Sequence, residues 1–199
     1  MGESKKETFM ANIWKNNPDI VQILGICSAL AVTNNMTNTL IMGIGLTFAT
    51  GFSSLTISAL RNYIPKNVRM MVQVLIIATY VIILDIVLKA YLPSISKALG
   101  PYVGLIITNC IIMGRAEAYA QSHGPALSFI DGISAGIGYS LILLLIAFIR
   151  ELLGFGSIFG MRILPDSFTP WVIMITAPSA FFIIGTIIWI ARSPLVKKK

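Results

Sequence analysis

The sequence has few charged residues and few of the side chains that usually carry catalysis. Asp, Glu, Lys and Arg together make up 12% of the 199 residues, about half of what a typical soluble domain contains. Histidine occurs once and cysteine twice. Because a soluble protein must cover its surface with polar groups, this shortage of charge excludes most soluble enzymes and nucleic-acid-binding domains.

Several motifs are also missing from the sequence. No glycine-rich phosphate loop follows a predicted strand, and no histidine-rich metal motif occurs. The segment Met1–Phe9 is polar and lacks the apolar core of a cleavable signal peptide. We therefore expect any nucleotide or flavin chemistry to lie on other chains, so that this chain alone holds no complete active site.

Long apolar stretches dominate what is present. Hydrophobic residues make up 56% of the chain, and its mean hydropathy is +0.82. No charged residue occurs from Ile20 to Leu60, which as one helix would be about twice as long as a bilayer core is thick. The chain must therefore fold back, and Thr33–Asn35 is the expected turn. The pattern predicts an all-α integral membrane protein with six transmembrane segments, at 20–34, 37–60, 68–92, 101–119, 126–149 and 171–191.

Two of the six segments are too short for ordinary spanning helices. Ile20–Thr33 ends at a Thr-Asn-Asn break, and Tyr102–Gly114 ends at Arg115, whereas about 20 residues are needed to cross. Each opens a set of three segments, so the second set enters the membrane from the opposite side. This predicts two inverted three-helix repeats, 20–92 and 101–191, with the first helix of each interrupted. Residues 1–19 and the basic tail 192–199 flank them.

The basic residues indicate the orientation rather than a nucleic-acid partner. The formal net charge is +7. With six segments, eleven of the fifteen Lys and Arg lie on the side that holds both termini, and the positive-inside rule makes that side the cytoplasm. The four on the other side are Lys89, Lys97, Arg150 and Arg162.

The two cysteines lie in the two short segments. Cys27 follows Gly25-Ile26, and Cys110 follows Thr108-Asn109. A single membrane cysteine usually behaves as a small hydrophobic residue, but this placement favours a paired role near mid-membrane. A disulfide would not explain the interrupted helices, whereas half of an iron–sulfur site would, since such clusters usually take four thiolates. The neighbours Ser28, Thr108 and Asn109 would then be expected to hydrogen-bond the sulfurs.

Three motifs resemble a known family. They are Gly25-Ile-Cys-Ser-Ala-Leu-Ala-Val-Thr33, Ile107-Thr-Asn-Cys-Ile-Ile-Met-Gly-Arg-Ala-Glu-Ala-Tyr-Ala120 and Ala177-Pro-Ser-Ala-Phe-Phe182. They resemble the D subunits of bacterial Na+-translocating NADH:quinone oxidoreductases, and the likeness extends from Asn16 to Arg192. The related E subunits of Rnf ferredoxin:NAD+ complexes share the Ala-Val-Thr and Thr-Asn-Cys elements.

The resemblance implies a function. A chain of this family is expected to be one of six subunits of a redox-driven ion translocase in the bacterial inner membrane, with NADH, flavins and quinone on other subunits. Cys27 and Cys110 would ligate an iron–sulfur cluster, expected as 2Fe-2S, shared with the inverted homologous E subunit. Electron transfer from NADH to ubiquinone would then drive Na+ export. The Rnf subunit is one alternative. A small secondary transporter is another, but it would not need two facing thiols.

Charged residues inside the membrane are the remaining candidates, because their burial is costly. Asp131 and Asp85 are candidate cation-interacting residues. Asp131 has no basic residue within four positions, whereas Asp85 is spaced for a structural ion pair with Lys89. Arg115 and Glu117 are expected to anchor the second cysteine segment.

Three further features have structural interpretations. Arg150 and Glu151 are expected to snorkel from a helix end, and His123 is expected to be solvated in a polar loop. Gly132-Ile-Ser-Ala-Gly136 matches a helix-packing motif of small residues.

Overall fold

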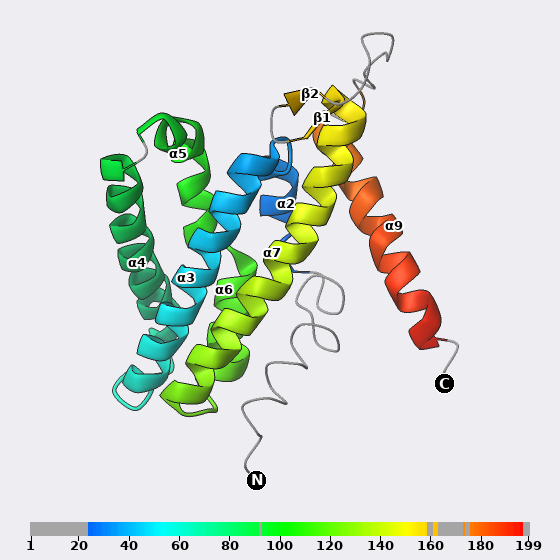
Figure 1. Ribbon diagram of the computed structural model, residues 1–199. Helices are drawn as coiled ribbons and strands as arrows, with labels where there is room; N and C mark the ends of the chain where they lie inside the picture. Colours follow the sequence, from blue (N-terminus) through cyan, green and yellow to red (C-terminus); the bar gives the residue numbers. More distant parts are fainter. Residues whose placement is uncertain (1–23, 92, 159–160, 163–172, 174–175, 197–199) are drawn as a thin grey trace.

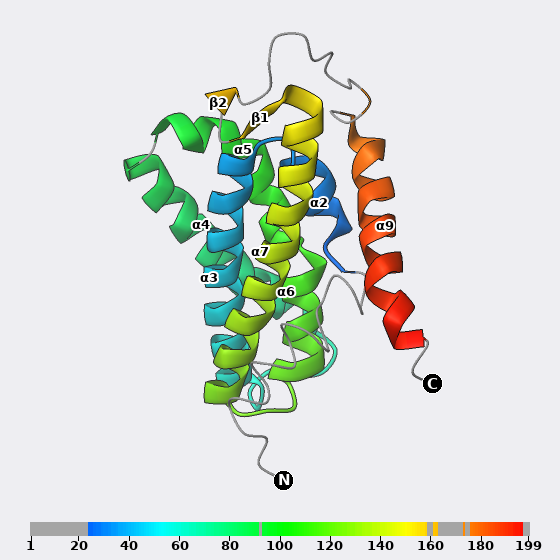
Figure 2. The same cartoon turned by 45° about the vertical axis from the view of Figure 1, so that its right-hand side comes forward.

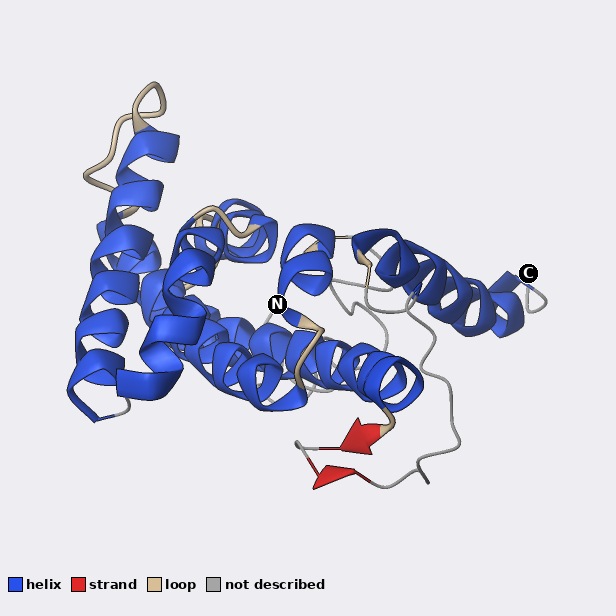
Figure 3. Ribbon diagram, turned by 90° about the horizontal axis from the view of Figure 1, so that it is seen from above, coloured by secondary structure: helices blue, strands red, loops and turns tan. Residues whose placement is uncertain are grey.

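The computed structural model describes residues 24–91, 93–158, 161–162, 173 and 176–196, and this part of the chain is almost entirely helical (Figure 1). The strands β1 (Ser157–Ile158) and β2 (Met161–Arg162) form a two-residue antiparallel ladder at the edge of the helices (Figure 3). The helices are α2 (Ile26–Val32), α3 (Met36–Leu60), α4 (Arg69–Tyr91), α5 (Pro93–Ile107), α6 (Cys110–Arg115), the π-helical turn η2 (Ala116–Ala120), α7 (Pro125–Phe155) and α9 (Ala177–Val196).

Three helices are long and apolar enough to cross a membrane. They are Met36–Leu60, Arg69–Tyr91 and Pro125–Gly154, and the shorter apolar segment Pro178–Ile190 follows in α9. The first two match the predicted segments 37–60 and 68–92 closely, and the third begins where 126–149 was predicted but continues further. Residues 20–23 of the first predicted segment and most of 171–175 in the last lie outside the described residues. The protein is thus a helical membrane protein.

The predicted interruption of 101–119 is present. The helix stops at Ile107, and a new one begins at Cys110 after two non-helical residues. The Asn109 side chain causes the restart, because its Oδ1 accepts the Ile111 backbone N–H at 2.9 Å and caps α6. The helix before this break begins earlier than predicted, at Pro93. Proline is favoured in the first turn of a helix, since its fixed φ suits that position and its missing N–H is not needed there.

Helices α3 and α7 lie side by side and antiparallel at the centre of the bundle (Figures 1 and 2). Glycines allow this approach. A Cβ atom at Gly136 would lie 2.7 Å from the Thr47 Cα, and one at Gly132 would lie 2.8 Å from the Thr50 carbonyl oxygen. The packing role predicted for this motif is therefore confirmed. In a bilayer, where lipid is as apolar as leucine, such close backbone packing holds helices together.

The helix ends divide between two sides of the bundle. The C-terminal ends of α3 and α9 and the turn from η2 to α7 lie at one end (Figure 1). The turn from α2 to α3, the junction of α4 with α5 and the strand pair lie at the other end. Arg61, Lys66 and Arg69 all belong to the first end, which is the side that the sequence assigns to the cytoplasm.

Candidate functional site

The two cysteines meet at the starts of two short helices. Cys27 lies in the first turn of α2 and is exposed, whereas Cys110 is the first residue of α6 and is half-buried. Both are free thiols, and Gly25, two residues before Cys27, donates its backbone N–H to Cys110 Sγ at 2.9 Å. The fold therefore brings together two residues that lie far apart in the sequence.

A polar network, most of it buried, lies beside Cys110. The Gly25 backbone N–H donates to Cys110 Sγ at 2.9 Å, and the Tyr139 hydroxyl of α7 donates to the Gly25 carbonyl at 3.0 Å. The Asn109 amide donates to Ser28 Oγ at 3.1 Å, so the network joins the two cysteine segments directly.

The sequence identified only some of these groups. Ser28 and Asn109 were expected to hydrogen-bond the sulfurs, but they bond to each other, and Thr108 donates to the carbonyl of Gly104 in its own helix. That expectation is wrong, because helix geometry directs these side chains to nearby backbone and to one another. The donor to sulfur is a backbone N–H, and the contact of Tyr139 has no signature in the sequence.

The donor set fits half of an iron–sulfur site. The Gly25–Cys110 hydrogen bond holds the segment of Cys27 against Cys110, and Cys27 is exposed, so a second chain can reach it. Within the described residues, no group of three or more His, Cys, Asp or Glu side chains could hold a metal ion. A cluster that needs four thiolates would therefore take two from here and two from a partner.

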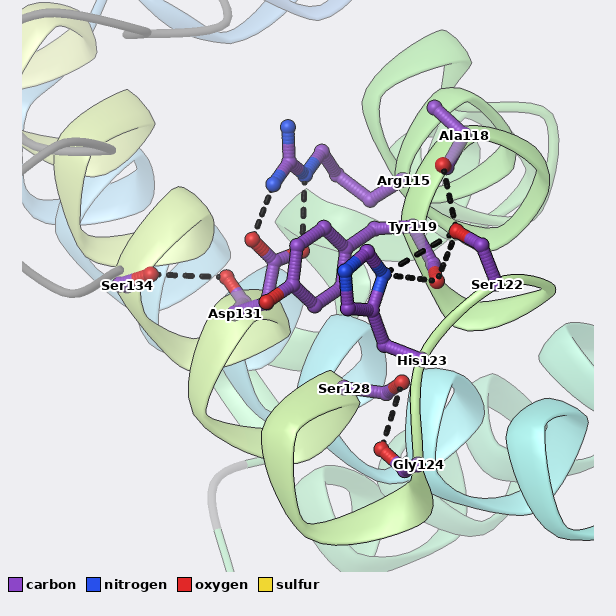
Figure 4. Close-up of polar contacts among 9 residues, drawn as sticks. All are labelled: Arg115, Ala118, Tyr119, Ser122, His123, Gly124, Ser128, Asp131 and Ser134. Atoms are coloured by element: carbon purple, nitrogen blue, oxygen red, sulfur yellow. Dashed lines mark hydrogen bonds and ion pairs between the residues drawn. The ribbon is translucent and has the colours of Figure 1, made fainter. Parts of the chain in front are cut away.

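A second feature, a buried ion pair, lies at the far end of α6 (Figure 4). Arg115 Nε donates to Asp131 Oδ2 at 2.9 Å, and Nη2 bonds the other carboxylate oxygen. The two side chains are only 8% and 1% exposed. The guanidinium also lies 5.4 Å from the centre of the Tyr119 ring. Two hydrogen bonds between the guanidinium and the carboxylate make this contact strong and directional.

This pair corrects the interpretation of Asp131 as an unpaired carboxylate. Its partner is 16 residues away in the sequence and reaches it from another helix. Residues within four positions of Asp131 lie on its own helix, so sequence spacing does not reveal a partner on α6. Any cation that binds Asp131 must therefore compete with Arg115.

Two other carboxylates, Glu117 and Asp85, form ion pairs as well. Glu117 accepts bonds from Arg69 and, at 3.0 Å, from the Gln73 side chain, both on α4. Arg115 and Glu117 thus tie the end of the cysteine helix to two neighbours, a geometry that suits the anchoring role predicted for them. Asp85 forms the expected pair with Lys89 at 2.6 Å.

Arg150 does not snorkel to the interface. It is 2% exposed, and it donates to Thr33 Oγ1 at 2.6 Å and to the Thr176 carbonyl at 3.2 Å. Its neighbour Glu151 accepts the Met36 backbone N–H at 2.8 Å. The snorkelling expectation is wrong, because the non-helical turn between α2 and α3 supplies polar groups within reach of this helix end.

His123 is packed rather than freely solvated. Its ring stacks on Tyr119 with centroids 3.9 Å apart (Figure 4). Its backbone carbonyl accepts bonds from Ser58 at 2.7 Å and from Arg61 at 2.9 Å. The residue therefore helps to hold the end of α3 against the start of α7.

Fold and site together define a class: a helical membrane protein with one cysteine at the start of each of two short helices and a buried ion pair at the far end of one of them. The family model described as "Rnf-Nqr subunit, membrane protein" matches residues 5–188. The chain belongs to this family, which confirms the resemblance seen in the three motifs.

Relatives carry a more specific name. The chain is 52% identical over 193 residues to the D subunit of the Na(+)-translocating NADH-quinone reductase of Pseudomonas paraeruginosa, covering 94% of this chain and 86% of the relative. It is also 52% identical to the protein of that name from Pseudoalteromonas translucida, covering 94% and 92%. The Yersinia pestis protein of the same name is 50% identical, with 97% and 96% covered. The expected kinship with a subunit of a redox-driven ion translocase is confirmed.

Proposed function

We propose that this chain is the electron-relay D subunit of a Na+-translocating NADH:quinone oxidoreductase in the membrane. The observation that carries the proposal is the hydrogen bond from the Gly25 N–H to Cys110 Sγ, which holds the start of the helix that contains Cys27 against the start of α6. In this role the two thiolates hold one half of an iron–sulfur centre, expected as 2Fe-2S, and the homologous E subunit supplies the other half. The relatives' names support the assignment to this enzyme.

The chemistry of each part follows from its surroundings. The centre, when bound, supplies one-electron transfer. Cys27 and Cys110 orient it, and the Gly25 N–H offsets negative charge at Cys110. We expect NADH, flavins and the quinone, expected to be ubiquinone, to bind to other subunits of the six-subunit complex, because the sequence has no glycine-rich phosphate loop.

The contacts at the ends of the two central helices support an inverted repeat. The end of α3, through Ser58 and Arg61, binds the carbonyl of His123 in the turn before α7. The end of α7, through Arg150 and Glu151, binds the turn before α3 at Thr33 and Met36. Each long helix thus holds the turn that leads into the other. This reciprocity is what two three-helix repeats related by a twofold axis in the membrane plane would produce.

We place both termini in the cytoplasm of a bacterial cell, with the protein in the inner membrane. The basic ends of α3 and α4 lie at the same end of the bundle as the end of α9, which agrees with the positive-inside rule. Single cysteines introduced at Lys66 and at Lys89 should be labelled by a membrane-impermeant maleimide from opposite sides, Lys66 from the cytoplasm. Labelling of Lys66 from outside would contradict this orientation.

The function is tested most directly by replacing the chain in its complex. A strain that lacks this chain should show no Na+-dependent NADH:quinone reductase activity in its membranes, and the plasmid-borne chain should restore it. Upstream oxidation of NADH by artificial acceptors should persist, because that chemistry belongs to other subunits. Full quinone reduction in the absence of the chain would contradict the proposal.

The two alternative functions, an Rnf E subunit and a secondary transporter, require different features of the chain. An Rnf E subunit would serve ferredoxin and NAD+, whereas the relatives at about half identity are named for the NADH–quinone enzyme. A secondary transporter would have no need for Cys27 beside Cys110. The complementation experiment distinguishes both, since neither would restore quinone reduction by NADH.

We further propose that Asp131 is the cation-interacting carboxylate of this chain, with Asp85 second to it. Asp131 lies on α7 and is buried against Arg115, the last residue of α6. Cys110 is the first residue of that same helix. Because Arg115 compensates the charge of Asp131, a cation could enter only as the guanidinium withdraws. Asp85 is already paired with Lys89, whose side chain is 63% exposed, and that arrangement is typical of a structural pair.

A further inference from the structure

A chain of hydrogen bonds connects α7 to the sulfur of Cys110. The Gly25 N–H donates to Cys110 Sγ, and the Gly25 carbonyl accepts from the hydroxyl of Tyr139. Gly25 precedes α2, Cys110 begins α6, and Tyr139 lies 114 residues from Gly25 on α7. Three separate segments therefore meet at one backbone residue that contacts a thiol.

The backbone of Gly25 has a conformation that only glycine adopts easily. Its φ is 90° and its ψ is 8°, in the left-handed region. A Cβ atom here would lie 2.6 Å from Tyr139 Cε2 and 2.7 Å from Ile111 Cδ1. The ring of Tyr139 thus closes the space around Gly25 on one side, and it restrains the residue whose N–H points at the sulfur.

The hydroxyl of Tyr139 belongs to the same buried network. With its own proton donated to the Gly25 carbonyl, it accepts from the Ser28 hydroxyl, and Ser28 Oγ accepts from the Asn109 amide. Tyr139, Ser28 and Asn109 are all 0% exposed. A buried network in which the members bond one another fixes a single geometry, and here that geometry includes both cysteine segments.

We propose that Tyr139 is a positioning residue for the redox centre, holding the Gly25 N–H against Cys110 Sγ and so raising the reduction potential of the centre. This inference rests on the proposed function, because it takes Cys27 and Cys110 as ligands. A hydrogen bond to a ligating sulfur stabilises the negative charge that reduction adds, and such bonds tune the potentials of iron–sulfur centres.

The test is Tyr139→Phe in the complete purified complex. The substitution keeps the ring that packs on Gly25 and removes only the hydroxyl. We expect iron and acid-labile sulfide to remain, the midpoint potential to shift to a more negative value, and the electron paramagnetic resonance spectrum of the reduced centre to change. Tyr80→Phe is the matched control, because the Tyr80 hydroxyl bonds Thr56 at 2.7 Å between α3 and α4. The control should leave potential and spectrum unchanged.

The outcomes separate this inference from the proposed function. An unaltered potential and spectrum in a fully loaded Tyr139→Phe complex overturns the positioning role alone. If Tyr139→Phe leaves no centre to titrate, Ser28→Ala, which removes the hydroxyl that bonds Tyr139, should shift the potential in the same direction. No shift there also overturns the role. Iron content that is unchanged in Cys27→Ala and Cys110→Ala overturns the proposed function together with this inference.

Discussion

Replacing either Cys27 or Cys110 with alanine is expected to remove the iron and acid-labile sulfide of one centre from the complex and to stop electron transfer from NADH to quinone. Two thiolates from this chain and two from a partner complete a four-thiolate set, so the loss of one leaves the cluster under-ligated. Either single substitution should therefore be as severe as the double. Metal analysis and electron paramagnetic resonance on the purified complex measure the loss.

Thr108→Ala is the control for the cysteine substitutions. Thr108 stands two residues before Cys110, and its exposed hydroxyl donates to the Gly104 carbonyl of its own helix. Its removal should leave iron content and quinone reduction unchanged. NADH oxidation by artificial acceptors should survive in all of these variants. Full iron content in an assembled Cys27→Ala or Cys110→Ala complex would refute the ligand assignment.

Breaking the Arg115–Asp131 pair is expected to have the second largest effect. Both side chains are almost fully buried, and removing one partner leaves the other charge buried and uncompensated. Such a loss costs about 3 to 5 kcal/mol. Asp131→Ala and Arg115→Met should each lower the unfolding temperature of the detergent-solubilised complex sharply. The double variant Arg115→Met with Asp131→Leu should recover much of the stability, because no unpaired charge remains.

The double variant also separates stability from cation binding. If Asp131 interacts with Na+, the double variant should assemble but show a weakened Na+ dependence of turnover. Asp85→Ala, which breaks a partly exposed pair expected to contribute about 0 to 1 kcal/mol, should change both quantities less. An unchanged Na+ titration in an assembled double variant would reduce Asp131 to a structural partner of Arg115.

Helix boundaries were predicted well where length and hydropathy decide them. The segments 37–60 and 68–92 agree with α3 and α4 to within a residue or so, because a mostly apolar stretch of that length pairs its backbone groups within itself as a helix in a bilayer. The prediction was less accurate for α7, which continues past 149 to Phe155. Its end is fixed by Gly156, whose φ of 64° allows a left-handed cap, and the buried Arg150 and Glu151 remain inside the helix.

The candidate site was predicted in part. The cysteines stood out because they are the only two in the chain and both fall in unusually short segments. The roles of Gly25 and Tyr139 could not be predicted, because hydrogen bonds between distant segments leave no periodic signal. The same reason explains the error at Asp131, where the pattern within one helix gave no indication of Arg115.

The sequence by itself determined the class of the protein, the interruption within 101–119 and the two thiols. These follow from local quantities, since the free energy of burying charge or backbone in lipid depends on each segment's own residues. Only the tertiary structure decided which distant residues bond to one another. These hydrogen bonds run from the Gly25 N–H to Cys110, from Tyr139 to Gly25, and from Arg115 to Asp131. Such contacts depend on how α2, α6 and α7 pack against one another, and packing is a property of the whole bundle rather than of any one segment.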